Sequence, residues 1–320
     1  MKFEPSKLSK IIEQNYSHLM PDFFEMQTEY LASLNIIYHD LDASLVAMVL
    51  TSELYKNTIK EINSKSKISL KCFYQNDNFE LPVSVYKIKH ISTILNLPRE
   101  TVRRKKVKLI KDKIIILDKK NKLYSLNINV IEKKNLDTQI DNLSKFLFKF
   151  LVFFNHNRFF VKEVSREQIK KDIEDKFLLY LTKFLDFQIS YFANMKTFLD
   201  IKSIFIVLLC TLNTTSQIKD KKEPMTYKNM FSRVHQLNNT FGLNATSIAE
   251  ITRVPRTTLL RKISNLEKIG ILKKDKFKRY VSDDLTKSDL PTKKIPIMYN
   301  NIKQLSIFFS QCLETYSAKY

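Results

Sequence analysis

The sequence predicts a mainly α-helical protein with small β-hairpins, in which a unit of several helices and one hairpin occurs twice. Apolar residues recur at three- and four-residue steps over long stretches of the 320-residue chain. Most of the scarce arginines lie in two short clusters, and a shift of 157 residues superimposes these clusters. With 44% hydrophobic residues, each half can bury a core of its own, so a folded protein is expected.

The internal repeat is clearest around two Pro-Arg pairs. A shift of 157 residues aligns Pro98-Arg99 with Pro255-Arg256. The same shift matches Ile91 with Ile248, Ile94 with Ile251, Thr101 with Thr258, Arg104 with Arg261, Lys105 with Lys262 and Leu109 with Leu266. Chance similarity between two segments rich in Lys and Ile explains isolated matches better than it explains this consecutive pattern. We therefore predict a first repeat over 1–157 and a second over 158–320, arranged as a single-chain analogue of a symmetric dimer.

Each repeat is expected to begin with two apolar helices and to end with a third. In the first half a helical stripe covers 23–41, and Asp42 begins a second helix that continues to about residue 57. The corresponding helices of the second half are expected over 177–195 and 200–212, and the closing helices near 143–154 and 302–313. These stripes indicate core packing. Two lysine-rich segments with turn-forming residues, 63–67 and 219–224, are predicted to be exposed loops.

The centre of the second half, about 240–284, predicts two short helices and a hairpin. Residues 247–252 form the first helix with Ile248 and Ile251 facing inward, Pro255 begins the second helix, and Gly270 follows its end. The second helix buries Leu259, Ile263, Leu266 and Ile269, and its opposite face offers Arg256, Thr257, Leu260 and Arg261. The strand-like pairs 271–272 and 280–281 then flank a basic hairpin tip.

The centre of the first half, about 82–127, predicts the same elements. Residues 85–95 lead into a tight connection at 96–97, and a helix runs from Pro98 to about residue 112. Strands over 114–117 and 123–126 are expected to flank a tip that contains Lys119, Lys120 and Lys122.

The charge balance favours a polyanionic partner. Lys and Arg total 54 against 33 Asp and Glu, which gives a formal net charge of +21. Of ten arginines, six lie in the two clusters, namely Arg99, Arg103, Arg104, Arg253, Arg256 and Arg261. The planar guanidinium group binds guanine edges and phosphates through two hydrogen bonds, so these clusters are candidate contact surfaces. A solvated helix face is the alternative interpretation of the same clusters.

The composition excludes several classes of site. With only Gly242 and Gly270, the chain has no phosphate-binding loop of the P-loop or dinucleotide type and no nucleophile elbow. Its three cysteines and five histidines lack the spacing of metal ligands, and Asp283, Asp284 and Asp289 are expected in a solvated loop. We therefore predict no enzyme, metal or cofactor. No signal peptide is recognisable and the most apolar stretch, 204–212, is too short to cross a membrane, so a cytoplasmic protein is expected.

The two segments LPRETVRRKKVKLIKDKIII and VPRTTLLRKISNLEKIGIL resemble the recognition-helix region of bacterial winged helix-turn-helix transcriptional regulators. The resemblance covers about 40 residues in each half and is specific for the superfamily. It implies that DNA faces Arg99, Glu100, Thr101, Arg103 and Arg104 in the first copy and Arg256, Thr257, Thr258 and Arg261 in the second. Basic residues near these helices are expected to join them: Lys106, Lys119, Lys120, Lys122, Arg253, Lys274, Lys276, Lys278 and Arg279. The first copy departs from the family pattern at Lys106, where an apolar residue is expected, and at Lys113, where the second copy has glycine.

These observations predict a protein that binds double-stranded DNA sequence-specifically and acts as a transcriptional regulator. Binding to a membrane is not expected. The two half-sites should differ, because Glu100 corresponds to Thr257 and Arg103 to Leu260. A plasmid or chromosomal initiator of replication or partition with tandem winged helices is an alternative. In another alternative, only the second copy binds DNA. The duplication would allow the chain to act as a monomer, and a small-molecule effector among the helices stays an open question.

Overall fold

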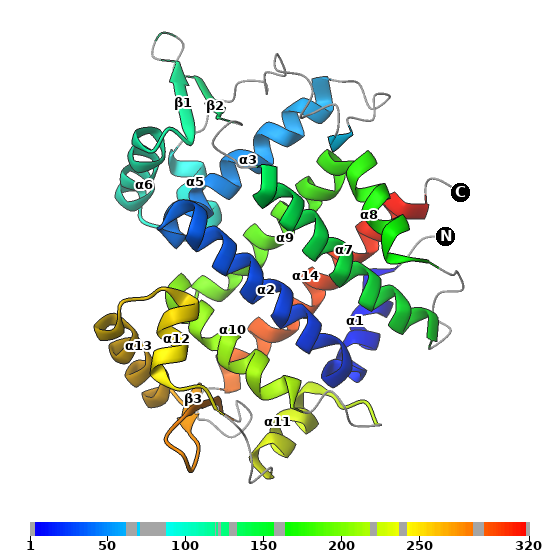
Figure 1. Ribbon diagram of the computed structural model, residues 1–320, viewed down its shortest axis with the longest axis vertical. Coiled ribbons are helices and arrows are strands. Elements are labelled where there is room, and N and C mark those ends of the chain that lie inside the picture. Colours follow the sequence, from blue (N-terminus) through cyan, green and yellow to red (C-terminus); the bar gives the residue numbers. More distant parts are fainter. Residues whose placement is uncertain are drawn as a thin grey trace. The chain divides into compact units, whose positions relative to one another are not determined.

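A computed structural model describes residues 4–61, 69–70, 88–118, 120, 123–127, 133–156, 164–217, 223–236, 242–283 and 291–317. Over these residues the protein is mainly helical and has two small antiparallel hairpins (Figure 1). The predicted fold class is confirmed at this level. The predicted loop at 63–67 and most of that at 219–224 lie outside the described residues.

The chain forms two compact units, and each unit draws on both halves of the sequence. One unit comprises Asp42–Ala193 and the end of the chain from Phe308, and the other comprises Glu4–Leu41 and Asn194–Ile307. The compact units therefore cross the boundary between 1–157 and 158–320. Those ranges stay a prediction about repeats in the sequence.

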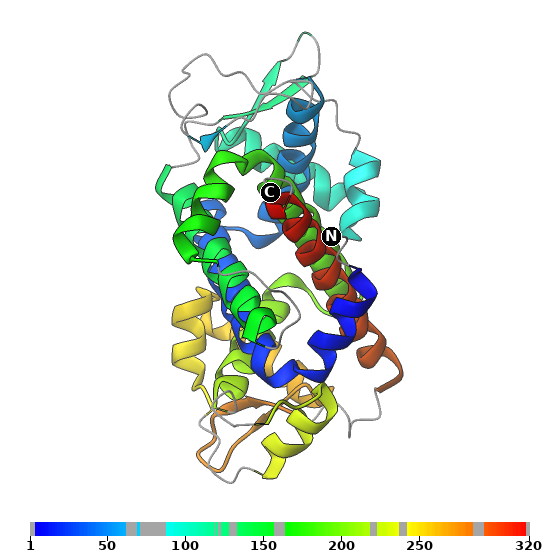
Figure 2. The same ribbon diagram turned by 90° about the vertical axis from the view of Figure 1, so that its right-hand side faces the viewer.

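The first unit contains six helices within its described residues, one hairpin and the last turns of α14. Its elements are α3 (Leu41–Glu61), α5 (Ile88–Leu95), α6 (Arg99–Lys111), β1 (Ile115–Asp118), β2 (Leu123–Leu126), α7 (Lys133–His156), α8 (Arg166–Asp175), α9 (Phe177–Lys196) and the end of α14 (Pro291–Ser317). Figure 2 shows the two antiparallel arms of the β1–β2 hairpin in teal. Aromatic side chains dominate the core of this unit, because Phe150 and Phe187 of different helices pack against Phe309 and Phe308 with ring centroids 5.5 and 5.0 Å apart.

A buried charged group fastens the end of α14 within the first unit. The Lys176 ammonium lies 3.0 Å from a carboxylate oxygen of Asp172, and both side chains are almost fully buried. Tyr180 Oη donates a hydrogen bond of 2.7 Å to the same carboxylate, and Lys176 Nζ donates one of 2.7 Å to the Thr315 carbonyl. Because each charge has a partner, their burial is tolerated, and a cation satisfies a carbonyl in the last turn of α14.

The second unit is built around α10. Its elements are α1 (Pro5–Gln14), α2 (Tyr16–Tyr38), α10 (Ile201–Ser216), α11 (Tyr227–Gln236), α12 (Ala245–Thr252), α13 (Arg256–Lys268), β3 (Leu272–Lys274), β4 (Tyr280–Ser282) and the greater part of α14. Helix α10 packs against α2, α12 and α13 (Figure 1). The shared core contains Ile206, Leu209, Ile248, Leu259, Ile263 and Leu266. Two short helices and a hairpin are thereby fixed to the longer helices.

The long helices confirm the predicted apolar stripes, whereas one short helix is rotated from the predicted phase. The stripes at 143–154, 177–195, 200–212 and 302–313 fall on α7, α9, α10 and α14. The stripe at 23–41 falls on α2 only as far as Tyr38, because His39 ends that helix and Leu41 begins α3, which contains the helix predicted over 42–57. Ile251, predicted to face inward from α12, is 44% exposed. Thr252 is buried in its place and donates from Oγ1 to the Ile248 carbonyl at 2.6 Å. Residues three and four positions after Ile248 both lie near its face of the helix, and the hydrogen bond to the Ile248 carbonyl allows the polar Thr252 to be the buried one.

Asp200 links two helices of the second unit. Its carboxylate accepts the backbone N–H groups of Lys202 and Ser203 at 3.1 and 3.2 Å, which caps α10, and also accepts from Lys262 Nζ of α13 at 2.7 Å. Partial burial alone would raise the pKa of this carboxyl, but the hydrogen bonds from Lys262 and Ser203 outweigh it and lower the pKa. A lowered folded-state pKa means that the contribution to stability is complete above the pKa of the unfolded carboxyl and is lost as the pH falls through the folded-state pKa.

We expect Asp200→Asn to reduce the free energy of unfolding near neutral pH, because the amide still caps α10 but no longer attracts the Lys262 ammonium. This deficit should begin to shrink below about pH 4, where the carboxyl of the unfolded chain takes up its proton, and should vanish only below the lowered folded-state pKa of Asp200. Asp200→Ala should lose a further ~1 kcal/mol at every pH, because it also removes the cap. Urea midpoints at a series of pH values measure both effects. A deficit of Asp200→Asn that stays constant from pH 7 to about pH 3 would contradict the ion pair.

Candidate nucleic-acid interface

The turn between α12 and α13 sets the direction of α13. Arg253 has a left-handed backbone (φ 52°), and the next residue, Val254, is buried. Pro255 occupies the N-cap with φ −52°, and its carbonyl accepts the Leu259 N–H at 2.9 Å. The sequence predicts that Pro255 is the first helical residue. In the structure it is the N-cap and precedes that residue. The tight turn orients α13 because its central apolar side chain is part of the core.

The end of α13 passes directly into the β3–β4 hairpin. Gly270 adopts φ 63°, its N–H donates to the Glu267 carbonyl at 3.0 Å, and Ile271 N–H donates to the Leu266 carbonyl at 2.9 Å. This pair of hydrogen bonds is a Schellman motif, which satisfies carbonyls that the last helical turn leaves open. The predicted stop at Gly270 is confirmed, and it fixes where the hairpin begins.

Helix α13 separates an apolar face from a basic face. Leu259, Ile263 and Leu266 are buried, as predicted, whereas Ile269, also predicted to be buried, is the half-buried C-cap residue. Of the residues predicted on the opposite face, Arg256, Thr257, Arg261 and Arg253 of the preceding turn are exposed, Leu260 is 41% exposed, and Thr258 is half-buried. Arg256 Nη1 donates to Thr246 Oγ1 at 2.9 Å, so this guanidinium is held near the start of α12.

Helices α5 and α6 of the first unit repeat this geometry. Asn96 is left-handed (φ 48°), Ser92 and Leu97 exchange hydrogen bonds of 2.6 and 3.1 Å across the turn, and Pro98 is the N-cap of α6. At the other end Lys113 has φ 57°, and Ile114 N–H donates to the Leu109 carbonyl at 3.0 Å. The lysine thus adopts the conformation that glycine has in the second unit. A residue other than glycine is disfavoured in this left-handed conformation by about 1 kcal/mol, and the surrounding packing offsets this cost.

The exposed face of α6 carries both signs of charge. Arg99, Glu100, Arg103 and Arg104 are exposed, and Thr101 is half-buried. Arg103 donates from Nε and Nη2 to the two carboxylate oxygens of Glu100, each at 2.8 Å. These hydrogen bonds lower the pKa of Glu100. One predicted DNA-contacting guanidinium is therefore already paired with a carboxylate.

Lys106 does not lie on this surface, contrary to the prediction. Its side chain is only 6% exposed, and Nζ lies 3.5 Å from the centre of the Tyr124 ring on β2. The shift of 157 residues aligns it with Ile263, which is buried in α13. The methylene chain fills an apolar position, and the aromatic ring stabilises the ammonium through a cation–π contact.

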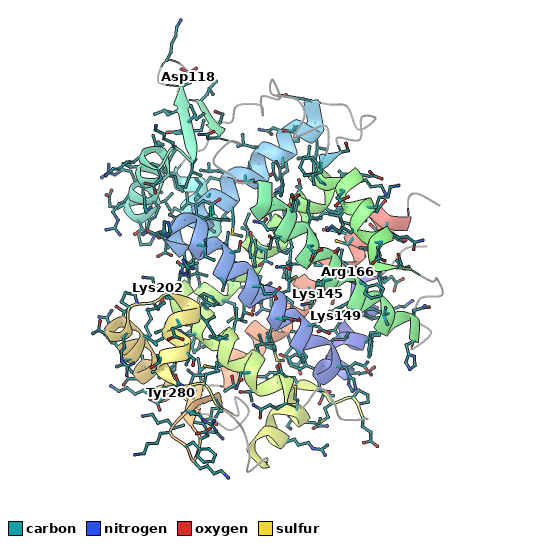
Figure 3. All side chains as sticks on the ribbon, in the orientation of Figure 1. Asp118, Lys145, Lys149, Arg166, Lys202 and Tyr280 are labelled. Atoms are coloured by element: carbon teal, nitrogen blue, oxygen red, sulfur yellow. The ribbon has the colours of Figure 1, made fainter. Side chains whose placement is uncertain are left out.

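The β3–β4 hairpin places its basic residues in different environments. Lys276 and Lys278 are exposed, and Lys274 Nζ lies 3.8 Å from Glu267 Oε1. Arg279, which the sequence predicts to contact DNA, is half-buried, and its Nε donates to Asp275 Oδ2 at 3.1 Å, so it also supports the hairpin. Figure 3 marks Tyr280, the first residue of β4.

In the β1–β2 hairpin, Lys119 and Lys122 lie outside the described residues, whereas Lys120 is exposed. Its backbone N–H donates to Asp118 Oδ1 at 2.9 Å, and Figure 3 marks Asp118 at the end of β1.

Two residues that the sequence did not single out contribute to this region. Asp275 organises the second hairpin tip, and Phe277 is exposed on it. The spacing of Asp275 and Arg279 in the sequence could have indicated a turn held by a hydrogen bond between them. The exposed phenylalanine had no such signal, because an isolated aromatic residue in a sequence is usually part of the core.

The comparisons identify no relative of this chain. No family model, no curated protein and no solved structure matches it. Among the described residues, no group of three or more His, Cys, Asp or Glu side chains could hold a metal ion. Within the same part of the chain, no single helix is long and apolar enough to cross a membrane. Helices α2 and α3 reach the necessary length and apolar content only when they are counted as one bent pair.

Two substitutions on α6 distinguish its buried side from its exposed side. We expect Arg104→Ala to weaken binding to duplex DNA and to reduce the dependence of affinity on salt, because an exposed cation is lost. Lys106→Met should change neither quantity, because Lys106 is buried and methionine has a similar length. Titrations of a fluorescent duplex at several salt concentrations measure both variants. A reduced salt dependence in Lys106→Met would contradict its assignment to the core.

Proposed function

We propose that this protein binds double-stranded DNA sequence-specifically through two winged helix-turn-helix modules and acts as a transcriptional regulator. The observation that carries the proposal is the division of α6 and α13 into two faces. Each helix buries one apolar face, follows a tight turn, precedes a hairpin and exposes arginines on its opposite face. In helix-turn-helix proteins the second helix occupies the major groove of DNA in this arrangement.

Matching backbone geometry supports the interpretation of the modules as copies. A shift of 157 residues relates left-handed Asn96 to left-handed Arg253 and left-handed Lys113 to left-handed Gly270. The hydrogen bond from Ile114 to Leu109 likewise corresponds to that from Ile271 to Leu266. Left-handed residues are uncommon outside glycine, so their recurrence at the same offset adds to the sequence matches.

The exposed residue types fit DNA chemistry. A guanidinium can donate two hydrogen bonds to O6 and N7 of guanine, and lysine and threonine side chains hold phosphates. Among the described residues, no ion pair joins Arg256 or Arg261 to a carboxylate, and Arg256 donates to the Thr246 hydroxyl instead, whereas Arg103 of α6 is paired with Glu100. This difference supports unequal half-sites, with the stronger electrostatic contribution from α13.

Selection of duplexes from a random pool tests the proposal directly. We expect wild type to enrich a site with two related half-sites, Arg99→Ala to lose preference in one half and Arg256→Ala in the other. Each substitution should weaken binding by about 1–3 kcal/mol, because one bidentate contact to a base is lost. Lys106→Met, on the buried side of α6, is the matched control. Enrichment of no sequence by wild type would reject specific binding, and loss of preference only in Arg256→Ala would leave α13 as the single DNA-binding helix.

Salt dependence tests the electrostatic part of the same proposal. If about 6–10 phosphates are contacted, affinity should fall by roughly 10³ to 10⁵ between about 50 and 200 mM salt, because bound cations are released from DNA. Titration of the selected duplex provides this measurement. An affinity that hardly changes over this range would reject binding to the phosphate backbone.

Exchange of one pair of corresponding residues tests the asymmetry between α6 and α13. We expect Glu100→Thr to strengthen binding, because it releases the Arg103 guanidinium and removes a negative charge from the surface. Thr257→Glu should weaken binding through repulsion of phosphates and competition for the arginines of α13. Both positions are exposed, so thermal unfolding should be nearly unchanged. Equal affinities of the two variants and wild type would contradict a role of these faces in DNA contact.

A further inference from the structure

Phe277 is an exposed aromatic residue at the tip of the β3–β4 hairpin. It is 57% exposed and lies between the exposed lysines Lys276 and Lys278. Burial of a phenyl side chain is favourable, so its exposure in the free protein leaves apolar surface available to a partner. The surrounding positive charge favours a polyanionic partner.

The tip is organised to hold Phe277 outward. The Asp275 carboxylate accepts the backbone N–H groups of Phe277, Arg279 and Gly242 at 2.8, 2.9 and 3.0 Å. Lys278 is fixed in a left-handed conformation with φ 60°. A non-glycine residue adopts this conformation at some cost, so the structure around it must hold the turn in place.

The base of the hairpin is fastened as well. Leu243 and Tyr280 exchange two backbone hydrogen bonds of 3.0 and 2.8 Å. A Cβ atom on the neighbouring Gly242 would lie 2.8 Å from the Tyr280 carbonyl oxygen, so only glycine permits this close approach. The tip therefore extends from a hairpin with a third backbone segment bound to its edge.

The Phe277 ring has cationic neighbours. The Arg279 guanidinium carbon lies 4.7 Å and Lys276 Nζ 5.1 Å from the centre of the ring. Arg279 is itself held by Asp275, so it stays beside the ring. An apolar ring flanked by cations is complementary to a narrow groove whose edges are phosphates and whose stacked base steps can admit an apolar side chain.

The first hairpin carries a different group at the corresponding place. The shift of 157 residues aligns Asp275 with Asp118 and Phe277 with Lys120. The Lys120 N–H donates to Asp118 at 2.9 Å, as the Phe277 N–H does to Asp275 at 2.8 Å. The same hydrogen bond thus holds a lysine on one hairpin and a phenylalanine on the other.

We propose that Phe277 enters the minor groove of the bound duplex, separates the bases of one step and bends the DNA at the half-site next to α13. This inference rests on the proposed function and adds a contact that α13 alone does not provide. A phenyl ring cannot hydrogen-bond to phosphate, whereas apolar side chains inserted from the minor groove unstack a base step and kink DNA by about 20–90°. Flexible pyrimidine–purine steps should be preferred there, because they unstack most easily.

The test uses a short duplex enriched from a random pool by the full wild-type chain. Dyes at its two ends report bending through energy transfer, and 2-aminopurine placed at successive positions reports unstacking. We expect wild type to bend the duplex and to raise the fluorescence at one step on the α13 side. Phe277→Ala should bind about tenfold more weakly and lose both signals, because one aromatic contact to a base is removed.

Two further variants test whether an apolar side chain at position 277 causes the unstacking. Phe277→Leu should keep most of the bend, because leucine is also an effective wedge, and Phe277→Lys should bind without unstacking. Val152→Ala is the matched control, because Val152 is a 47% exposed apolar residue on α7, outside the hairpins and the helices proposed to contact DNA. Equal bending by wild type and Phe277→Ala would overturn the wedge while leaving DNA binding intact. Failure of wild type to bind any duplex at low salt would overturn the proposed function and the wedge together.

Discussion

The exposed arginines of α13 hold fixed positions because the opposite face of the same helix is buried. Leu259, Ile263 and Leu266 join the core formed with α10 and α12, which prevents rotation of α13 about its axis. The bond between Lys262 and Asp200 adds a polar tie to the first turn of α10. The residues proposed to contact DNA therefore depend on groups that would never touch it.

Both ends of this helix are set by backbone conformations that few residues adopt readily. The turn before α13 needs a left-handed residue, and Arg253 supplies it beside buried Val254. The end of the helix needs another, which is Gly270 in this unit and Lys113 after α6 in the other. Non-glycine residues are tolerated at such places when neighbouring packing and hydrogen bonds compensate for the strain. The same local geometry is thus reached with different side chains, which leaves their chemistry free to diverge.

The two modules use their surfaces differently. On α6 the Glu100 carboxylate binds Arg103 through two hydrogen bonds, whereas on α13 the corresponding residues are Thr257 and Leu260. A hydrogen-bonded turn presents Lys120 on one hairpin and Phe277 on the other. One backbone design therefore carries a carboxylate–guanidinium pair and a lysine-bearing hairpin on one side of the repeat, and neutral residues at the corresponding helix positions with a phenyl-bearing hairpin on the other. Such differences would allow a single chain to distinguish the two ends of an asymmetric site.

The sequence by itself determined the long apolar helices, the two tight turns and the hairpins, whereas the shorter helices α1, α8 and α11 were not predicted. The three- and four-residue periodicity, the capping residue Asp200 and the stop at Gly270 act between near neighbours, so they are legible without a structure. The exposed side of α13 followed from the same periodicity, because a helix that buries one stripe must expose the other.

Only the tertiary structure decided which basic residues are available and which segments form each unit. Lys106 is buried, with its ammonium against the Tyr124 ring, and Arg279 is bound to Asp275. On α12, Thr252 is buried and Ile251 is exposed. The compact units join Glu4–Leu41 to Asn194–Ile307, and Asp42–Ala193 to the end of the chain. These outcomes depend on contacts between residues far apart in the sequence or on the rotational phase of a very short helix. Local periodicity fixes neither, because it describes a segment without the surface against which that segment packs.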